Sequence, residues 1–419
     1  MPQTDDTPRR PRFYYGWVVL IVAAVAMTAT LPGRTHGLGL VSKPLMADLG
    51  ISEVTYTLVN SWAVVIGAAF CFPVGRLIDR VGARGVLAGV AAALGAAVLL
   101  MAQVSTVLWL AVTLTLVRGL GQGALSVVSM AMVGKWFTRR LGLAMAVFTV
   151  LLSVGFIAST LGVGGAVGQF GWRNTWAGVG VACLALAVVG WLIVRSTPES
   201  VGQVPDVPAD ETATSIDVPL AAALRSPAFW AFTASAALFN FVWSAITLLS
   251  ESLTADRGLG HDAYVAMMGM MVAGGLPANL LCGWLAPKVG LGRLQLAGMT
   301  ALAAAMAAYP HLTTETHALL YGLALGAAGG VVTVVFFTVN GELFGRRHLG
   351  AIQGTAQLVS VLASAAGPLV LATVRERAGA SDVFFDACAP AAVALGLAAW
   401  LAPRPTVTLS PSSAPLPPP

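Results

Sequence analysis

Twelve apolar runs, each long enough to cross a lipid bilayer, occupy most of this chain of 419 residues. A membrane-spanning helix needs about 20 mainly apolar residues, and its backbone polar groups must be hydrogen-bonded within the segment. The runs therefore predict an all-α membrane protein and not a soluble domain. We place the spans at residues 15–39, 53–74, 85–105, 107–131, 143–168, 174–194, 228–250, 262–286, 293–310, 316–340, 350–373 and 384–402.

The composition excludes several classes of function. Hydrophobic residues make up 57% of the chain and charged residues only 10%, whereas soluble domains carry about 25% charged residues. The net charge of +5 follows the loops between spans and so indicates no nucleic-acid partner. The four cysteines lie in apolar runs without paired spacing, which predicts neither disulfides nor a metal site. No phosphate-binding loop or nucleophile motif is present, so we expect no cofactor, no catalytic residues and no enzymatic activity.

The lysines and arginines are distributed unequally between the two sides of the predicted membrane. With the N-terminus inside, sixteen of the 23 fall in cytoplasmic segments, six fall in outer segments and one, Arg118, lies within a span. This bias follows the positive-inside rule. It predicts a multi-pass protein of the inner (cytoplasmic) membrane, with both termini in the cytoplasm.

A polar, acidic segment at residues 196–226 divides the spans into two sets of six. Short loops elsewhere make this segment the natural boundary between two helical bundles. The tail that follows the last span is rich in Pro and Ser and is expected to be disordered. We therefore expect a cytoplasmic N-terminus at 1–14, a six-helix bundle at 15–195, a cytoplasmic linker at 196–226, a second six-helix bundle at 227–402 and a disordered tail at 403–419.

Two correspondences between the halves indicate an internal duplication. Residues 283–290 end span 8 as residues 75–82 end span 2, with Pro287 in place of Asp79. Residues 343–350, after span 10, likewise match residues 136–142, after span 4. Two matches at equivalent positions favour a repeated architecture more strongly than one would.

The segment from Gly75 to Arg84, read as a short turn between spans 2 and 3, carries glycines, arginines and a single aspartate. Glycines allow tight turns and close helix approach. Asp79, at the end of a helix, can pair with an arginine or cap the N-terminus of a neighbouring helix. The pattern Gly-x-Leu-x-Asp-Arg-x-Gly-x-Arg resembles the loop 2–3 signature of the major facilitator superfamily.

This resemblance implies two pseudo-symmetric six-helix bundles around a central cavity that opens alternately to each side of the membrane. It also implies a monomer, surrounded by lipid, that acts on a small-molecule substrate. Asp79 and Arg84, with other loop arginines, are expected to hold the cytoplasmic side closed. The gating residues implied in this way are Gly75, Asp79, Arg80, Gly82 and Arg84.

A second match is the run Arg118-Gly119-Leu120-Gly121-Gln122-Gly123 in span 4. A buried arginine costs at least about 2.5–3.5 kcal/mol at a helix centre, so it tends to face the bundle interior or a wet cavity. The run resembles the span-4 signature of the superfamily, whose arginine is associated with proton coupling. The alternative is a structural arginine that hydrogen-bonds to carbonyls of a neighbouring helix, and the sequence leaves both interpretations open.

Several further runs narrow the resemblance to one branch of the superfamily. They resemble the prokaryotic monocarboxylate porter and oxalate–formate antiporter branch, over roughly residues 13–400. The runs are Tyr15-Gly16-Trp17, Trp136-Phe137-Thr138-Arg139-Arg140, Gly171-Trp172-Arg173 and Arg225-Ser226-Pro227-Ala228-Phe229-Trp230.

Span 1 contains Pro32-Gly33, followed by Arg34, Thr35 and His36. Proline and glycine interrupt a helix, and broken helices near substrate sites are a recurrent feature of transporters. By the resemblance, His36 falls where relatives place a lysine or tyrosine in the cavity. A histidine, with an ordinary pKa of about 6.5, can bind a carboxylate when charged and release it when neutral. The alternative is that Arg34 and His36 simply mark the outer membrane surface.

The second half departs from the branch pattern. Asn279 stands where oxalate-type relatives have an arginine, and the region of Gln357 lacks their lysine. A dicarboxylate that needs two cations is therefore disfavoured, whereas a monocarboxylate or a larger amphipathic molecule fits. The candidate substrate-binding residues are Arg34, Thr35, His36, Ser126, Asn240, Trp243, Asn279 and Gln357.

These observations predict a secondary active transporter that moves a small organic solute of the monocarboxylate type by alternating access. All acidic residues lie in loops or at span ends, so Arg118 and His36 are the candidate coupling residues if protons are the coupling ion. Two other classes stay open. One is an efflux transporter for amphipathic or drug-like compounds, and the other is a non-transporting membrane sensor of the same fold.

Overall fold

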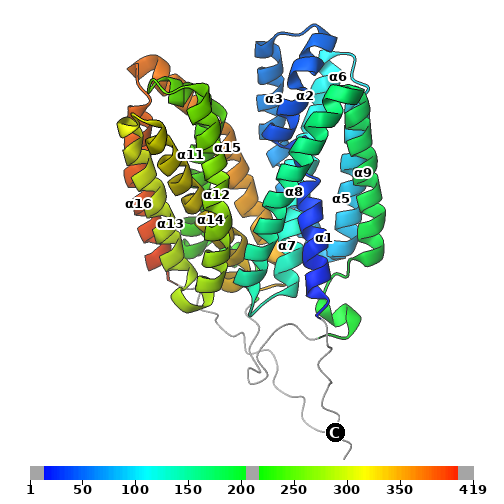
Figure 1. Ribbon diagram of the computed structural model, residues 1–419. Helices are drawn as coiled ribbons and strands as arrows, with labels where there is room; N and C mark the ends of the chain where they lie inside the picture. The colour runs from blue at the N-terminus through cyan, green and yellow to red at the C-terminus, as the bar shows by residue number, and fades with distance from the viewer. Residues whose placement is uncertain (1–13, 204–216, 404–419) are drawn as a thin grey trace, which may run out of the picture.

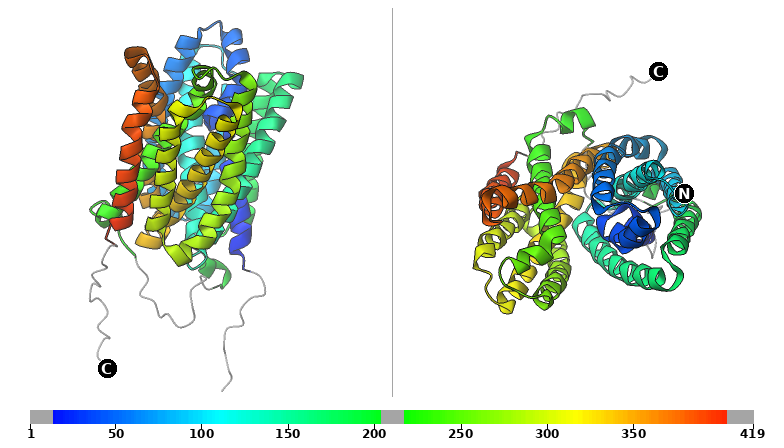
Figure 2. Two further views of the ribbon diagram at one scale, coloured as in Figure 1. Left: turned by 60° about the vertical axis from the view of Figure 1, so that its left-hand side comes forward. Right: turned by 90° about the horizontal axis from the view of Figure 1, so that it is seen from above.

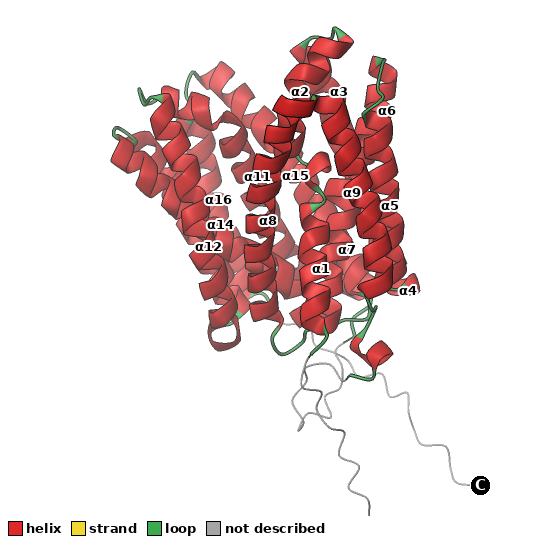
Figure 3. Ribbon diagram, turned by 45° about the vertical axis from the view of Figure 1, so that its right-hand side comes forward, coloured by secondary structure: helices red, strands yellow, loops and turns green. Residues whose placement is uncertain are grey.

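The structure, a computed structural model, describes residues 14–203 and 217–403. These residues are almost entirely helical, and none of them forms a strand (Figure 3). Residues 1–13, 204–216 and 404–419 lie outside the described part of the chain. The predictions for the N-terminus, for the acidic part of the linker and for the tail concern these residues in whole or in part, and they stay predictions.

The first half of the chain folds into a bundle of helices (Figure 1, blue to green). Three of its predicted spans are built from more than one helical segment. The elements are α1 (Gly16–Thr28), η1 (Leu31–Gly33), α2 (Thr35–Leu49), α3 (Glu53–Ala68), α4 (Cys71–Val81), α5 (Ala83–Met101), α6 (Val107–Val117), η2 (Arg118–Leu125), α7 (Ser126–Trp136), α8 (Leu141–Phe170) and α9 (Trp172–Ile193).

The second half forms a second bundle from longer, unbroken helices (Figure 1, green to red). Two short helices, η3 (Pro198–Val201) and α10 (Leu220–Ala223), lie in the connection between the bundles. The long helices are α11 (Pro227–Ala255), α12 (His261–Val289), α13 (Leu291–Ala308, followed by η4, Tyr309–His311), α14 (Glu315–Phe344), α15 (Leu349–Ala378) and α16 (Asp382–Leu401).

Eleven helices among the described residues are long and apolar enough to span a membrane. The predicted first span is the twelfth: it consists of the short apolar helix α1, the 3-10 turn η1 and the helix α2. The two bundles stand side by side and diverge toward the end that carries the α2–α3 connection (Figures 1 and 2). The predicted all-α architecture of two six-helix bundles is therefore confirmed.

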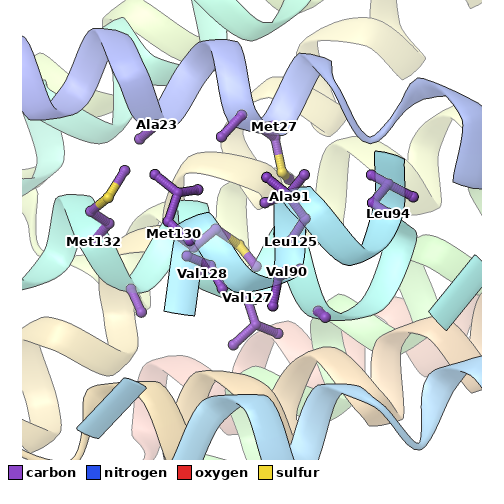
Figure 4. Close-up of a cluster of buried hydrophobic side chains, with 14 of the residues drawn as sticks. Ala23, Met27, Val90, Ala91, Leu94, Leu125, Val127, Val128, Met130 and Met132 are labelled. Carbon is purple, nitrogen blue, oxygen red and sulfur yellow. The ribbon is translucent and has the colours of Figure 1, made fainter. Parts of the chain in front are cut away.

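Helix α7 forms the centre of the first bundle. Every residue from Ser126 to Trp136 is buried, so this mainly apolar helix is covered on all sides. Figure 4 shows its side chains and Leu125 packed against Ala23 and Met27 of α1 and against residues of α5. A helix surrounded in this way is fixed by its neighbours. It is therefore a rigid support for the side chains of η2, which precedes it in the chain.

The segment that contains Gly75 and Asp79 is helical, which corrects the prediction of a turn. Helix α4 continues to Val81 and ends only at Gly82, whose φ of 91° lies in a region that favours glycine. Arg and Leu have good helix propensity and Ile an acceptable one, so the charged side chains of Arg76, Asp79 and Arg80 end the hydropathic run without ending the helix. Asp79 consequently projects from the last turns of a helix.

Two helix crossings close the end of the molecule at which α1 begins and α16 ends. Where α4 crosses α15, a Cβ added to Gly75 or to Gly350 would overlap with the backbone of the other residue. Where α8 crosses α12, a Cβ on Gly283 would lie 2.6 Å from the carbonyl oxygen of Gly142. We call these the α4–α15 and α8–α12 crossings. Their glycines bring the two bundles into backbone contact.

Candidate functional site

The break in the first span presents Arg34 and His36 to the interior. Pro32 lies in the 3-10 turn η1, and Arg34 has an extended backbone with φ −104° and ψ 154°. Gly33 packs against η2: a Cβ on Gly121 would lie 3.1 Å from the Cα of Gly33. The interruption predicted from Pro32-Gly33 is therefore present, although the chain resumes a helix that continues to Leu49.

Arg34 is held by two hydroxyl groups and an aromatic ring. Its Nε donates to Thr30 Oγ1 at 2.8 Å, and its Nη2 donates to Ser126 Oγ at 3.1 Å. Its guanidinium carbon lies 5.2 Å from the ring centre of Phe156. Among the described residues, Nη1 makes no hydrogen bond and no acidic side chain pairs with this arginine. The group can therefore bind an anion.

Arg118 is 2% exposed and is surrounded by neutral acceptors. Its Nη2 and Nε donate to Asn60 Oδ1 at 2.6 and 3.1 Å. Its Nη1 donates to the carbonyl oxygen of Gly33 at 3.2 Å, to Thr35 Oγ1 at 3.3 Å and to Gln122 Oε1 at 3.1 Å. These contacts join the first span, α3 and η2. The geometry supports the structural interpretation of this arginine and leaves proton coupling as a proposal.

The residue Arg118 begins an eight-residue π-helix, η2, within the fourth span. A π-helix is rare and often occurs at functional sites, because it adds a residue to the turn and re-aims side chains. Here it is rich in glycine, and Gly67 of α3 packs closely on it: a Cβ on Gly67 would lie 2.8 Å from the Gly119 nitrogen. The sequence gives no indication of this change in helix geometry.

A cavity of about 710 Å³ lies between the two bundles. On α8 its wall extends from Thr149 to Leu161, which is about 18 Å along the helix axis. It lies beyond the two crossings, toward the end where the bundles diverge. The lining includes six of the eight predicted substrate-binding residues: Arg34, His36, Asn240, Trp243, Asn279 and Gln357.

The other two predicted residues, Thr35 and Ser126, do not line the cavity but hydrogen-bond to arginines. Ser126 accepts the hydrogen bond from Arg34, and Thr35 accepts one from Arg118. His36 does line the cavity, with its ring 5.0 Å from that of Phe156 in an edge-to-face arrangement. The structure thus gathers the predicted residues around one cavity, while their roles stay predictions.

Sequence reasoning missed most of the aromatic wall. Phe156 of α8 packs beside both Arg34 and His36, and Phe239, Phe336 and Phe337 line the second bundle's side. In an apolar span a phenylalanine that faces a cavity cannot be distinguished from one that faces lipid. The sequence offered one signal for Phe156: Thr149, Ser153 and Phe156 follow one another at spacings of four and three residues, which places all three on one face of a helix.

At the closed end, Asp79 accepts hydrogen bonds from the backbone nitrogens of Gly350 at 3.1 Å and Ala351 at 2.8 Å. It therefore caps the N-terminus of α15, which is one of the two roles that the sequence predicted for Asp79. Its charge partner is Lys135 of α7, with 2.8 Å between Nζ and Oδ1. We call Asp79, Lys135 and the first turn of α15 the charged latch.

The predicted pairing of Asp79 with arginines is wrong in this structure. Arg84 lies on Trp191, 4.5 Å from its ring centre, and donates from Nε to the Trp191 carbonyl at 2.6 Å. Arg80 is exposed on the surface of α4. The helical continuation of α4 explains this difference, because it turns Asp79 toward α15 and Arg80 away from it.

No group of three or more His, Cys, Asp or Glu side chains among the described residues is arranged to hold a metal ion. The cavity wall itself contains no acidic residue within the described segments. What the site offers is a guanidinium and an imidazole on one side and neutral amides and rings on the other. This arrangement suits binding and release rather than covalent chemistry.

Comparisons with known proteins agree with the architecture. A family model described as Major Facilitator Superfamily matches residues 16–368. The chain is 29% identical to monocarboxylate transporter 11 of Homo sapiens over 301 residues, which cover 68% of this chain and 60% of that protein. It therefore spans less than two thirds of the length of that relative. It is also 24% identical to monocarboxylate transporter 13 of Bos taurus over 376 residues, which cover 87% and 84% of the two chains.

Two solved structures share the fold. The human organic anion transporter MFSD10 superposes with a TM-score of 0.69 at 17% identity, over 92% of this chain and all of that one. The proton:xylose symporter XylE superposes with a TM-score of 0.72 at 13% identity, over 92% and 95% of the two chains. At these identities the likeness concerns the fold alone.

Proposed function

Because this chain belongs to the major facilitator superfamily and has monocarboxylate transporters among its relatives, we propose that it carries an organic monocarboxylate across the membrane. It is a transporter and not an enzyme, as its fold and homologues show. The observation that carries the proposal is Arg34. This arginine lines the central cavity, lacks an acidic partner among the described residues and keeps one terminal nitrogen for a ligand.

The proposed cycle is alternating access. The positive-inside distribution assigns the closed end to the cytoplasm, so the structure corresponds to an outward-facing state. A substrate that enters the cavity binds Arg34, and the bundles then rock until the crossings separate and the outer ends meet. The charged latch stabilises the outward-facing state, because Asp79 of the first bundle, paired with Lys135 of the same bundle, caps α15 of the second bundle at the closed end.

Proton coupling is proposed through His36. Its imidazole lies at the cavity wall beside Arg34 and Phe156. A protonated ring adds a positive charge where the carboxylate binds, and its deprotonation weakens binding. This assignment makes transport depend on pH through one named group in the cavity.

A ligand screen on the detergent-purified protein, read as thermal stabilisation at two pH values, tests the proposal. The panel contains monocarboxylates, dicarboxylates, aromatic acids and neutral amphiphiles, since a bound ligand raises the melting temperature by mass action. We expect monocarboxylates to stabilise the protein, more at low pH, and Arg34→Gln to abolish the shift. Arg76→Gln is the matched control, because Arg76 is exposed and stacks only on Phe72.

Other outcomes of the same screen identify the two rival functions. If only neutral or cationic amphiphiles stabilise the protein, the carboxylate proposal fails and efflux of amphipathic compounds replaces it. If a carboxylate binds but proteoliposomes show no counterflow of it, the protein is a sensor that retains a transporter fold. Loss of the pH dependence in His36→Ala, with binding at high pH intact, distinguishes the role of His36 from that of Arg34.

A further inference from the structure

The charges around the central cavity restrict its ligand to one ionised group. Among the described residues that line it, only Arg34 and His36 are ionisable with a basic character, and both belong to the first bundle. No lysine, aspartate or glutamate lines the wall there. A second carboxylate would face a neutral wall, and an ammonium group would find no counter-charge. Both arrangements leave a poorly solvated charge.

The space between the walls is large and mainly apolar. A cavity of about 710 Å³ is in the range that holds drug-sized ligands, so an acid of two or three carbons leaves most of it empty. Phe156 lies next to the arginine, and Trp243 lies on the opposite bundle. Gly329 makes room for that indole, because a Cβ there would lie 3.1 Å from its ring. Such walls favour an aromatic or similarly flat body.

The second bundle contributes a polar group that has no partner. Asn279 of α12 is 6% exposed, and its Oδ1 is buried without a hydrogen bond. Neither end of this amide bonds to another described residue, although the side chain lines the cavity. Asn240 differs, because its Nδ2 donates to the carbonyl oxygen of Ala236 at 2.9 Å. A buried amide without a partner is unfavourable until a ligand or water supplies one.

We propose that the substrate is a monocarboxylate with an aromatic-sized apolar body and a neutral hydroxyl or amide group at its far end. The carboxylate binds Arg34, the body lies between Phe156 and Trp243, and the neutral group hydrogen-bonds to Asn279. This inference rests on the proposed function, since it deepens the same site. A hydroxyl suits an amide of either orientation, because it both donates and accepts.

The experiment compares pairs of acids that differ by one hydroxyl. Phenylacetate, phenylpropanoate and phenylbutanoate are each measured against the para-hydroxyphenyl acid of the same chain length, by titration of the purified wild-type protein. We expect the hydroxyl to improve affinity about tenfold at the chain length that reaches Asn279. Asn279→Leu, which keeps the volume and removes the amide, should erase that preference.

Gln295→Leu is the matched control. Gln295 of α13 is also a buried amide without partners, at 1% exposure, but it does not line the cavity. It should leave the hydroxyl preference unchanged, and Arg34→Gln should weaken both members of each pair equally. If the parent acids bind and no chain length shows a hydroxyl preference, this inference is wrong and the proposed function stands. If none of these acids binds the wild type, this inference is wrong, and the proposed function is decided by the other monocarboxylates of the ligand screen.

Discussion

The α4–α15 and α8–α12 crossings are related by the internal duplication, yet Asp79 of α4 at the first has no acidic counterpart at the equivalent position of α12 at the second. At both, glycines bring the backbones of two helices into contact, with Gly75 and Gly350 at one and Gly283 and Gly142 at the other. At the first, Asp79 caps α15 and pairs with Lys135. At the second, Pro287 occupies the place of Asp79. Close approach is therefore a property of the backbone, and the charged latch is an addition to it.

The cavity shows the same division between the bundles. In the first, Gly67 packs on η2 beside Arg118, whereas in the second the corresponding Gly275 packs on α14 beside Gly326. By the same correspondence Gly326 matches Gly119, and the buried Leu325 stands where the first bundle has Arg118. Within the described residues, the second bundle lines the cavity with uncharged residues only. The comparison teaches that the two halves share a scaffold while one half carries the ionic chemistry.

Asp79→Asn is expected to have the largest effect, because it leaves Lys135 without its counter-ion in a position that is 8% exposed. Breaking a buried ion pair costs about 3–5 kcal/mol. Asparagine keeps an oxygen for the cap on α15 but not the charge that strengthens this contact between the bundles. The outward-facing state should therefore lose stability, and uptake into proteoliposomes should fall steeply. Spin-label distances across the closed end should lengthen. Pro287→Ala, at the equivalent position of the α8–α12 crossing, should leave both readouts near wild type.

Two outcomes would remove the latch from this account. One is normal uptake by a well-expressed Asp79→Asn protein. The other is an Asp79→Asn/Lys135→Met double variant that is no better than the single variant, since removal of both charges should recover part of the loss. Both variants keep an amide oxygen at residue 79 that can cap α15, so their comparison isolates the charge of the pair from the cap.

Arg118→Lys tests the buried guanidinium that the second bundle lacks. Lysine keeps the charge but cannot reach Asn60, Gly33 and Thr35 together, because it lacks the guanidinium fork. Loss of hydrogen bonds to a charged group costs about 1.5–3 kcal/mol. We expect weaker substrate binding through a displaced Arg34, with the shape of the pH profile of uptake retained. A profile that shifts or flattens would instead assign Arg118 to proton coupling.

Gly75→Ala and Gly283→Ala should be similarly harmful, because both crossings depend on backbone contact. A methyl group at either site meets backbone atoms that cannot rotate away, and overpacking costs about 1–3 kcal/mol. Uptake and the spin-label distances should change in both variants. Gly89→Ala is the control, since nothing lies within 4 Å of a Cβ at that helical position. A severe effect at Gly75 alone would show that the crossings differ in more than charge.

Much of this fold can be predicted from the sequence because it follows from one-dimensional signals. Hydropathy locates the spans, Lys and Arg indicate the sides, and Pro32-Gly33 marks the break. The two duplicated turns reveal the repeat. Each of these signals is contained in a short stretch of chain, so no knowledge of tertiary contacts is needed.

The partners of the charged groups could not be predicted in the same way. Asp79 and Lys135 are far apart in sequence, and Lys135 resembles any lysine of a cytoplasmic loop until α7 is seen to continue to Trp136. In the sequence, Asn60 is one polar residue among several in its span, and nothing there indicates that it accepts hydrogen bonds from Arg118. Such pairings depend on where helices cross, and hydropathy carries no information about crossing points.

Substitution of Glu199 is expected to have the smallest effect. It tests whether ionic contacts other than the charged latch stabilise the α4–α15 crossing. This residue of η3 accepts a hydrogen bond from Arg346 Nη2, at the α14–α15 turn, at 3.3 Å. Partial burial raises its pKa, but a backbone hydrogen bond, Thr197 and Arg346 together lower the pKa below the ordinary 4.5. The contact therefore stabilises the folded protein above about pH 4.5 and is lost as the pH falls through the lowered value.

An exposed pair of this kind contributes about 0.2–1 kcal/mol. Glu199→Gln should lower the melting temperature slightly at about pH 6, and the difference from wild type should vanish once the pH falls below the lowered pKa of Glu199. Added salt should also reduce it. A difference that persists at low pH would mean that Glu199 acts through packing. In that case the charges that stabilise the α4–α15 crossing reduce to those of the charged latch, Asp79 and Lys135.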